Sequence, residues 1–183
     1  MASWRHPEGQ PHALMQPAQA PLDVPRAVRA RYERVEAEHQ PPAVARLATV
    51  VIDPGNRAAD IVGRLERDDI TPVGILLTHA HLDHIEGVAA LKRATGAPIW
   101  LHAADRPLYD AAGQQAAMFG MRVEPLPPPD EAWAHGDTYR FGDCSFEVRH
   151  APGHAPGHII LYSAAAALAF VGDVVFAGSI GRT

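Results

Sequence analysis

The chain has 183 residues and a formal net charge of −5, and 47% of its residues are hydrophobic. This composition is that of a globular protein long enough for one domain with a sizeable core. The net negative charge and the lack of a Lys/Arg-rich run argue against nucleic acid or an anionic membrane as a partner, because both would repel an acidic surface.

The numbers of cysteines and histidines bear on the cellular location and on the kind of site to expect. Cys144 is the only cysteine, which excludes an intramolecular disulfide and favours a reducing compartment. Residues 1–19 lack the apolar core of a signal peptide, and no stretch is apolar for long enough to span a membrane. We therefore expect a cytoplasmic protein. The 11 histidines lie mostly in a few clusters, and clustered imidazoles suggest a metal or catalytic site.

The first 47 residues differ in character from the rest. Residues 1–47 hold seven of the 17 prolines and almost no apolar alternation. One helix is expected over residues 26–39, with apolar side chains at i, i+4 and i+7. The remainder of this atypical, proline-rich segment is predicted to be irregular or disordered. A separate domain is expected over residues 48–183.

From residue 48 onward, strands and helices are predicted to alternate. The expected elements are a strand at 49–52, a helix at 58–68, a strand at 73–77, a helix at 85–95, a strand at 99–101 and a helix at 107–119. A proline-rich loop at 125–129 follows, and four strands are expected after it, at 138–141, 146–149, 158–162 and 168–171. Alternation followed by consecutive strands is typical of a layered α/β fold with a mixed sheet.

The strongest chemical motif is His79-x-His81-x-Asp83-His84, directly after the buried strand at 73–77. Residues i and i+2 at the end of a strand project to the same side, so His79 and His81 can converge on one ion. Asp83 and His84 lie where the chain turns into a helix and can face a second ion. Imidazole and carboxylate ligands suit zinc, iron or manganese, and the lack of cysteine ligands argues against a structural zinc site.

Two later motifs could complete such a site. The Pro/Gly-rich loop 151–158 contains His154 and His158, either of which could supply a third nitrogen. Asp173 follows the apolar run at 168–171, where a carboxylate is either a turn cap or a ligand that bridges two ions. Beside the other two motifs, the bridging interpretation is favoured.

Together these motifs resemble those of the metallo-β-lactamase superfamily. The matching segments are the signature at 78–84, the Pro-Gly-His motif at 152–154, the Gly-Asp motif at 172–173 and the preceding Asp-Pro-Gly turn at 53–55. The resemblance covers residues 48–183 and implies an αββα four-layer sandwich, here incomplete, with metals at one edge of the sheets. Within the superfamily, residues 176–183 most resemble the glyoxalase II-like group, the hydroxyacylglutathione hydrolases.

The resemblance also implies a ligand set. It places His79, His81 and His154 on a first metal, Asp83 and His84 on a second, and Asp173 between them. Asp83 and Asp173 would be the catalytic residues, and the cofactors would be two divalent ions, with zinc favoured and iron or manganese as alternatives. The histidines at positions 102, 135 and 150 match no ligand position and are interpreted as surface or supporting residues. The family pattern does not make His158, four residues past His154, a ligand either.

The implied activity is hydrolysis of a small-molecule thioester such as a glutathione conjugate, with neither nucleic acid nor membrane as partner. The family usually begins with further strands and continues to a last histidine ligand, so we expect a chain truncated at both ends. Two alternatives stay open: a persulfide dioxygenase-like oxidoreductase with one iron on His79, His154 and Asp173, and a metal-binding chain without turnover. Activity on β-lactams, lactones or nucleic acids is less favoured, and the sequence does not set the oligomeric state.

Overall fold

A computed structural model of the chain describes residues 48–183. The segment 1–47, with the helix expected over 26–39 and the proposed domain boundary, lies outside the described residues. Within 48–183, no helix combines the length and the apolar character needed to cross a bilayer.

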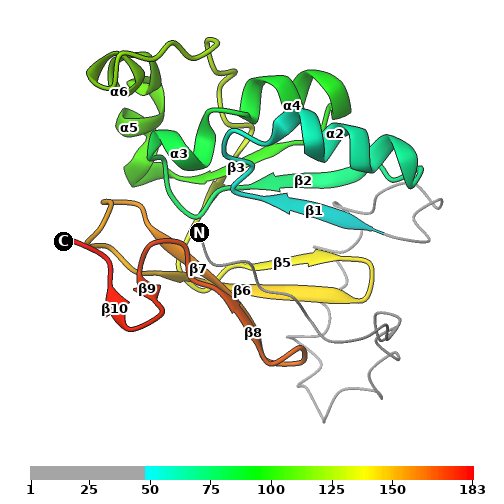
Figure 1. The fold of residues 1–183 in the computed structure, drawn as a ribbon. Helices are drawn as coiled ribbons and strands as arrows, with labels where there is room; N and C mark the ends of the chain where they lie inside the picture. The colour runs from blue at the N-terminus through cyan, green and yellow to red at the C-terminus, as the bar shows by residue number, and fades with distance from the viewer. Residues whose placement is uncertain (1–47) are drawn as a thin grey trace. The chain divides into compact units, whose positions relative to one another are not determined.

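The first half of the described chain forms a parallel sheet with helical crossovers. Its strands are β1 (Thr49–Ile52), β2 (Pro72–Leu76), β3 (Ile99–His102) and β4 (Glu131–Trp133), paired in that order. The connecting helices are α2 (Ala58–Arg67), α3 (Leu82–Ile85), α4 (Val88–Thr95), η1 (Ala103–Asp105), α5 (Arg106–Asp110) and α6 (Ala112–Met118). They all lie on one side of the sheet (Figure 1). Parallel strands need crossovers, and crossovers of one hand that advance across the sheet in one direction, here from β1 to β4, place their helices on the same face.

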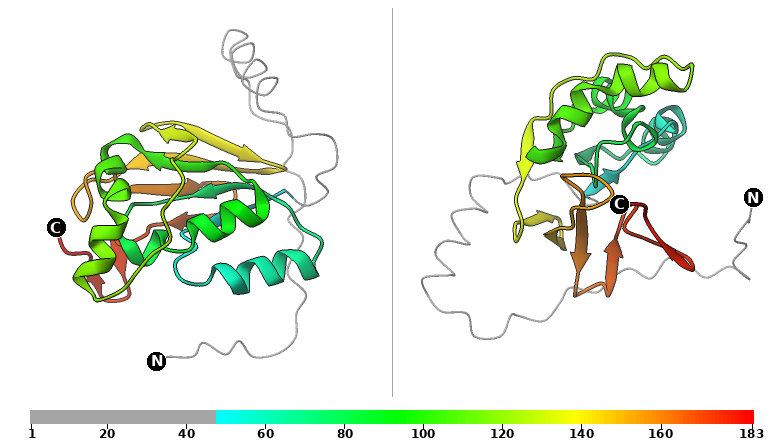
Figure 2. Two further views of the ribbon diagram at one scale, coloured as in Figure 1. Left: turned by 90° about the horizontal axis from the view of Figure 1, so that it is seen from above. Right: turned by 90° about the vertical axis from the view of Figure 1, so that its left-hand side faces the viewer.

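The second half forms an antiparallel sheet. Its strands, β5 (Thr138–Phe141), β6 (Cys144–His150), β7 (Ile159–Ser163) and β8 (Leu168–Phe170), pair in chain order. This sheet packs on the face of the parallel sheet that the helices leave open (Figure 1). A two-stranded hairpin of β9 (Val175–Phe176) and β10 (Ser179–Ile180) follows. Figure 2 shows this hairpin beside the loop that joins β6 to β7.

Strand β2 carries the core of both interfaces. Ile75 and the following Leu77 belong to the cluster under the helices, whereas Leu76 belongs to the cluster between the two sheets. All three side chains are fully buried. Since successive side chains of a strand point to opposite faces, a strand buried on both faces has an uninterrupted apolar sequence. The buried Ile75–Leu77 run leads directly into the His79 motif, and so fixes where this motif begins.

The fold class agrees with the sequence expectation, with two corrections to the sheets. The expected mixed sheet is wrong, since the strands separate into one parallel and one antiparallel sheet. The strands β4, β9 and β10 were not expected. Within residues 48–183 the layers are helices, parallel sheet and antiparallel sheet, and no described helix covers the outer face of the antiparallel sheet.

Two expected helices are each divided in two. The helix expected over 85–95 is interrupted at Gly87, where an added Cβ would lie 2.3 Å from the carbonyl oxygen of Gly55. The break lets the Asp53–Gly55 turn approach, and the N–H of Gly55 donates to the carbonyl of His84 at 3.0 Å. The helix expected over 107–119 is interrupted at Ala111. This break orients Gln115, whose side chain donates to the carbonyl of Ala80 and accepts from the N–H of Leu82.

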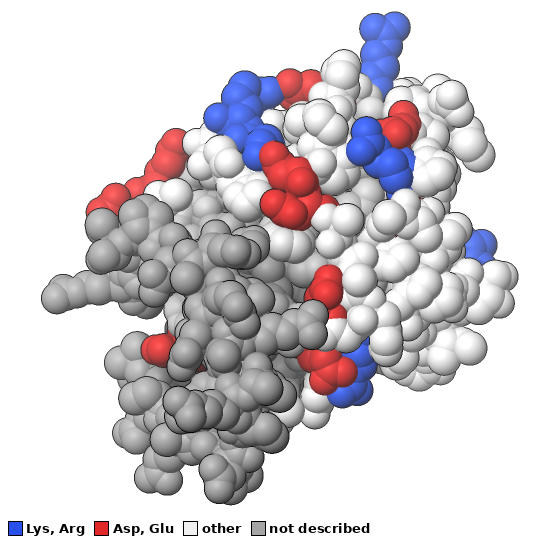
Figure 3. All heavy atoms as spheres, turned by 180° about the vertical axis from the view of Figure 1, so that it is seen from behind, with Lys and Arg blue, Asp and Glu red and all other residues white. Residues whose placement is uncertain are grey.

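The described surface carries charges of both signs. On the face shown in Figure 3, acidic and basic side chains are interspersed among uncharged ones. Among the described residues, Arg64 pairs with Asp68 and Lys92 with Asp130. The visible described atoms form no extended patch of one sign.

Candidate metal centre

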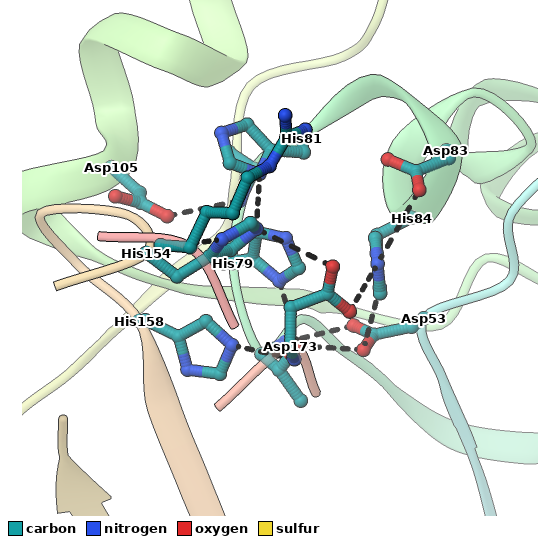
Figure 4. Close-up of polar contacts among 12 residues, drawn as sticks. Asp53, His79, His81, Asp83, His84, Asp105, His154, His158 and Asp173 are labelled. Atoms are coloured by element: carbon teal, nitrogen blue, oxygen red, sulfur yellow. Dashed lines mark hydrogen bonds and ion pairs between the residues drawn. The ribbon is translucent and has the colours of Figure 1, made fainter. Parts of the chain in front are cut away.

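Three separate stretches of chain meet at one edge of the two sheets (Figure 4). Residues 78–84 leave the end of β2, the loop 151–158 joins β6 to β7, and Asp173 lies between β8 and β9. The N–H of Ile159 donates to the carbonyl of Thr78 at 2.8 Å. This hydrogen bond joins the parallel sheet to the antiparallel sheet directly beside the cluster of histidines.

The side chains of His79, His81 and His154 converge. Their ligand atoms all lie within 4.8 Å of one another, and Nδ1 of His81 is 2.8 Å from Nε2 of His154. Nε2 of His79 is buried and has no hydrogen-bond partner among the described residues. An unpaired buried nitrogen is costly, and a divalent ion would satisfy it. Three converging imidazoles with one unpaired nitrogen fit a zinc-like ion.

Thr78 and Asp53 fix the orientation of the His79 ring. The hydroxyl of Thr78 donates to Oδ2 of Asp53 at 2.6 Å, and the N–H of Thr78 donates to Oδ1 at 2.8 Å. Because the Thr78 proton is used in this way, its oxygen accepts from Nδ1 of His79 at 3.1 Å. This assignment puts the ring proton on Nδ1 and leaves the lone pair on the unpaired Nε2, as a metal ligand requires.

A second group of donors surrounds His84. Its Nε2 is 3.2 Å from Oδ1 of Asp173 and 3.8 Å from Oδ2 of Asp83. The other oxygen of Asp173 is 3.4 Å from Nε2 of His154. Asp173 therefore presents one oxygen to each group of donors. The carboxylate of Asp83 is 78% exposed and lies at the open side of this group.

Asp53 also lies near His79 and His84, close enough for the three to form a possible metal-binding group. However, both of its oxygens already accept hydrogen bonds from Thr78, and Oδ2 also accepts from Nδ1 of His84 at 3.1 Å. We therefore assign Asp53 to orienting His84, whose Nε2 then carries the lone pair. Asp53 has a positive φ of 45°, an uncommon conformation for a residue other than glycine.

Burial keeps most of these imidazoles neutral. Burial, followed by the neighbouring histidines, lowers the pKa of His79 to about 2. Burial also lowers the pKa of His81 and of His158. For His84, burial lowers the pKa, but the hydrogen bond that it donates to Asp53 and the nearby carboxylates outweigh it and raise the pKa overall. Neutral imidazoles are the form that binds a metal ion.

Two further buried groups support the two loops. Asp105 is fully buried and accepts from the N–H groups of Ala80 and Gly157, which ties residues 78–84 to the loop 151–158. His158 stacks on His79, and its Nε2 accepts from the N–H of Asp173 at 3.1 Å. The His158 ring therefore positions Asp173 through the backbone N–H of Asp173. The side chain of His158 belongs to neither group of converging donors.

The structure thus brings together the side chains at positions 79, 81, 84, 154 and 173, with Asp83 at the edge. Whether these residues hold two ions stays a prediction. Asp53, Thr78 and Asp105 were missed as functional residues. The histidines at positions 102, 135 and 150 lie apart from the described donor groups, and His102 stacks on His150 at 4.1 Å between ring centroids.

Comparison with known proteins gives consistent matches. Residues 47–183 match the sequence model of the metallo-beta-lactamase superfamily. The hydroxyacylglutathione hydrolase GloC of Haemophilus influenzae is 37% identical over 135 residues, which are 73% of this chain and 64% of that protein.

Two solved structures are similar in fold and sequence. One is TTHA1623 in a di-iron-bound form, with a TM-score of 0.66, 40% identity and coverage of 72% of this chain and 64% of that one. The other is BLEG-1, a B3 metallo-beta-lactamase, with a TM-score of 0.67, 37% identity and coverage of 73% and 65%. The chain therefore spans slightly less than two thirds of the length of these relatives.

Proposed function

Because the chain belongs to the metallo-beta-lactamase superfamily, we propose that it is a metal-dependent hydrolase that acts on a small-molecule thioester, such as a glutathione conjugate. Similarity to a hydroxyacylglutathione hydrolase supports the thioester class. We further propose a cytoplasmic location, in keeping with the single cysteine and with the free thiol that hydrolysis of such a thioester releases.

The observation that carries the proposal is the position of Asp173. Its two carboxylate oxygens lie 3.2 Å from Nε2 of His84 and 3.4 Å from Nε2 of His154. A carboxylate that presents one oxygen to each of two donor groups suits a pair of ions better than a single one. We propose zinc in both positions, with iron or manganese as alternatives that the same donors accept.

The residues that converge at the site would hold two ions. His79, His81 and His154 would hold the first ion, Asp83 and His84 the second, and Asp173 would bridge them. Two bound divalent ions would supply a nucleophile by lowering the pKa of water, and would stabilise the negative charge that develops on the thioester carbonyl oxygen.

The carboxylate of Asp83 would orient the attacking water through its proton. Asp83 Oδ2 is exposed and lies 3.8 Å from Nε2 of His84, so it can accept a hydrogen bond from an incoming water and orient it. The departing thiolate needs little acid assistance, because thiols have a pKa of about 8.5. Cys144 starts β6 at the β5–β6 turn, whereas the loop 151–158 follows the other end of that strand, roughly 20 Å away at 3.3 Å per residue. Cys144 is therefore not the nucleophile.

The proposal is tested by metal analysis and kinetics on the full chain. We expect about two ions per chain and hydrolysis of S-lactoylglutathione in the wild type. His81→Ala should lose most of the bound metal and lower kcat/KM by more than the roughly 10- to 100-fold that follows loss of a group supporting a ligand. The matched control is His135→Ala, because His135 is exposed and lies outside the donor groups.

Several outcomes would reject the thioesterase proposal. One iron per chain with oxygen consumption on glutathione persulfide would establish the oxidoreductase instead. Faster hydrolysis of a cephalosporin than of any thioester would favour a β-lactamase, which the similarity to BLEG-1 makes worth measuring. Full metal content with no turnover of these substrates would indicate a metal-binding chain without this activity. Unchanged metal content in His81→Ala would contradict the ligand assignment.

A further inference from the structure

The last turn of the described chain packs against the donors of the first metal position. After β10, Gly181 donates its N–H to the carbonyl of Val174 at 3.1 Å, which closes the β9–β10 hairpin onto the residue following Asp173. The carbonyl of Arg182 is 3.0 Å from Nδ1 of His154. The hairpin is thus anchored beside Asp173 and touches the ring of His154 from the other side.

The contact with Arg182 selects the tautomer of the neutral His154 ring. A carbonyl oxygen can only accept, so Nδ1 of His154 must carry the proton and donate it. In a neutral ring Nε2 then carries the lone pair. Nε2 is the atom that faces His81 and Asp173. The backbone carbonyl of residue 182 therefore selects the form of His154 that can bind an ion.

Gly181 allows this approach because it has no side chain. A Cβ at position 181 would lie 1.8 Å from the carbonyl oxygen of Asp173 and 3.7 Å from Nδ1 of His154. Atoms cannot approach to 1.8 Å, so any side chain there must push the 181–182 backbone away from both donors. No positive φ is involved at this position, so the constraint is steric and directed at the site.

From these contacts we propose that Gly181 and the backbone carbonyl of Arg182 form a positioning element for the metal centre, which holds His154 in its Nδ1–H tautomer and keeps Asp173 in place. This inference rests on the proposed metal site but not on the proposed substrate. The Arg182 side chain does not contribute to this element. The β9–β10 hairpin holds the carbonyl of Arg182 next to the imidazole of His154.

The chain offers two matched controls. Gly178 lies in the turn of the same hairpin with a positive φ of 84°, and nothing lies within 4 Å of an added Cβ there. Gly178→Ala therefore strains the hairpin without touching a donor. Arg182→Ala removes the side chain and keeps the carbonyl. An ester in place of the Arg182–Thr183 peptide bond weakens the carbonyl as an acceptor without adding an atom to the site.

The experiment reads the tautomer of His154 and the affinity for zinc separately. Nitrogen-15 NMR of the metal-free full chain distinguishes a ring N–H from a lone pair, with the His154 signals assigned by their loss in His154→Gln. We expect the Nδ1–H form in the wild type, in Gly178→Ala and in Arg182→Ala, and a mixture of tautomers in Gly181→Ala. Zinc affinity should fall at least about tenfold in Gly181→Ala only.

The ester variant covers the case in which Gly181→Ala does not fold, and should shift the tautomer the same way and weaken zinc binding severalfold. The proposal is overturned if Gly181→Ala folds with the wild-type tautomer and zinc affinity. It is equally overturned if Gly178→Ala loses as much affinity, or if the ester variant behaves as the wild type. Neither measurement uses a substrate, so a failed thioesterase assay would leave the result intact.

Discussion

At the scale of single residues, three of the four imidazoles assigned to the centre are oriented by an oxygen on the side away from the other donors. His79 contacts the hydroxyl of Thr78, His84 the carboxylate of Asp53 and His154 the carbonyl of Arg182. Such partners fix both the ring orientation and the tautomer, and commonly change metal affinity by about 10- to 100-fold when removed. We therefore expect the metal affinity of the centre to depend also on residues that do not contact the ion.

Thr78→Val tests this dependence at the most buried ligand. The substitution conserves shape but removes the hydroxyl between His79 and Asp53, so His79 loses the acceptor for its Nδ1 proton. We expect zinc affinity to fall by about tenfold or more, measured by competition with a chelating dye. Thr78→Ser keeps the hydroxyl and should retain affinity within a few-fold. Equal losses in both variants would mean that the hydroxyl has no orienting role.

The sequence predicted the residues that converge but not the residues that orient them. His79, His81 and His84 were found because a strand followed by closely spaced histidines is an unusual pattern. Asp105 was missed because its role depends on reaching the N–H groups of two distant loops, at Ala80 and Gly157. Asp53 was identified only as part of a turn, although a carboxylate directly after a buried strand was a usable signal.

At the scale of elements, β2 joins the two halves of the core. Leu76 is fully buried between the sheets, one residue from side chains that pack under the helices. Leu76→Ala should lower the free energy of unfolding by about 2–5 kcal/mol, since it leaves a cavity in a region that cannot collapse easily.

The control for Leu76→Ala is the same substitution on an outer strand. Leu168 on β8 is 43% exposed, so Leu168→Ala should cost about 1 kcal/mol or less. Urea unfolding of the metal-free variants gives both values. A cost at Leu168 equal to that at Leu76 would contradict the proposed role of β2.

The longer elements followed from the sequence, whereas breaks and short strands did not. Apolar periodicity located β1, β2 and α2 within one or two residues. The break at Gly87 arises from the approach of the Gly55 turn, a contact between residues far apart in the chain. The strands β9 and β10 have two residues each, too few for any alternation to show.

At the scale of the whole molecule, the buried histidines make the stability of the metal-free chain depend on pH. The pKa of His79 falls from 6.5 to about 2 on folding, mainly through burial, and that of His158 is also lowered. Below pH 6.5 the unfolded chain binds protons that the folded chain does not. The free energy of unfolding should therefore fall with falling pH, by up to about 1.4 kcal/mol per pH unit for each such group. His84, with a raised pKa, partly offsets this.

Urea unfolding with chelator present, from about pH 7 to pH 5, checks this dependence. His79→Gln should reduce the slope by about one proton, because its side chain does not titrate. A stability that stays level or rises toward pH 5 in the wild type would contradict the assignment of neutral buried imidazoles.

The hydrogen bond from Ile159 to Thr78 joins the two sheets beside the histidines and has a consequence for biosynthesis. His79 and His81 emerge from the ribosome long before His154 and Asp173, and a lone histidine pair retains an ion only weakly. With the proposed ligand set, full ion capture would wait until distant segments have docked, a slow step because it needs contacts between residues far apart in the chain. A bound ion would then stabilise the chain after the two sheets have docked, and would not initiate folding. The supply of ions would therefore affect how much folded protein accumulates.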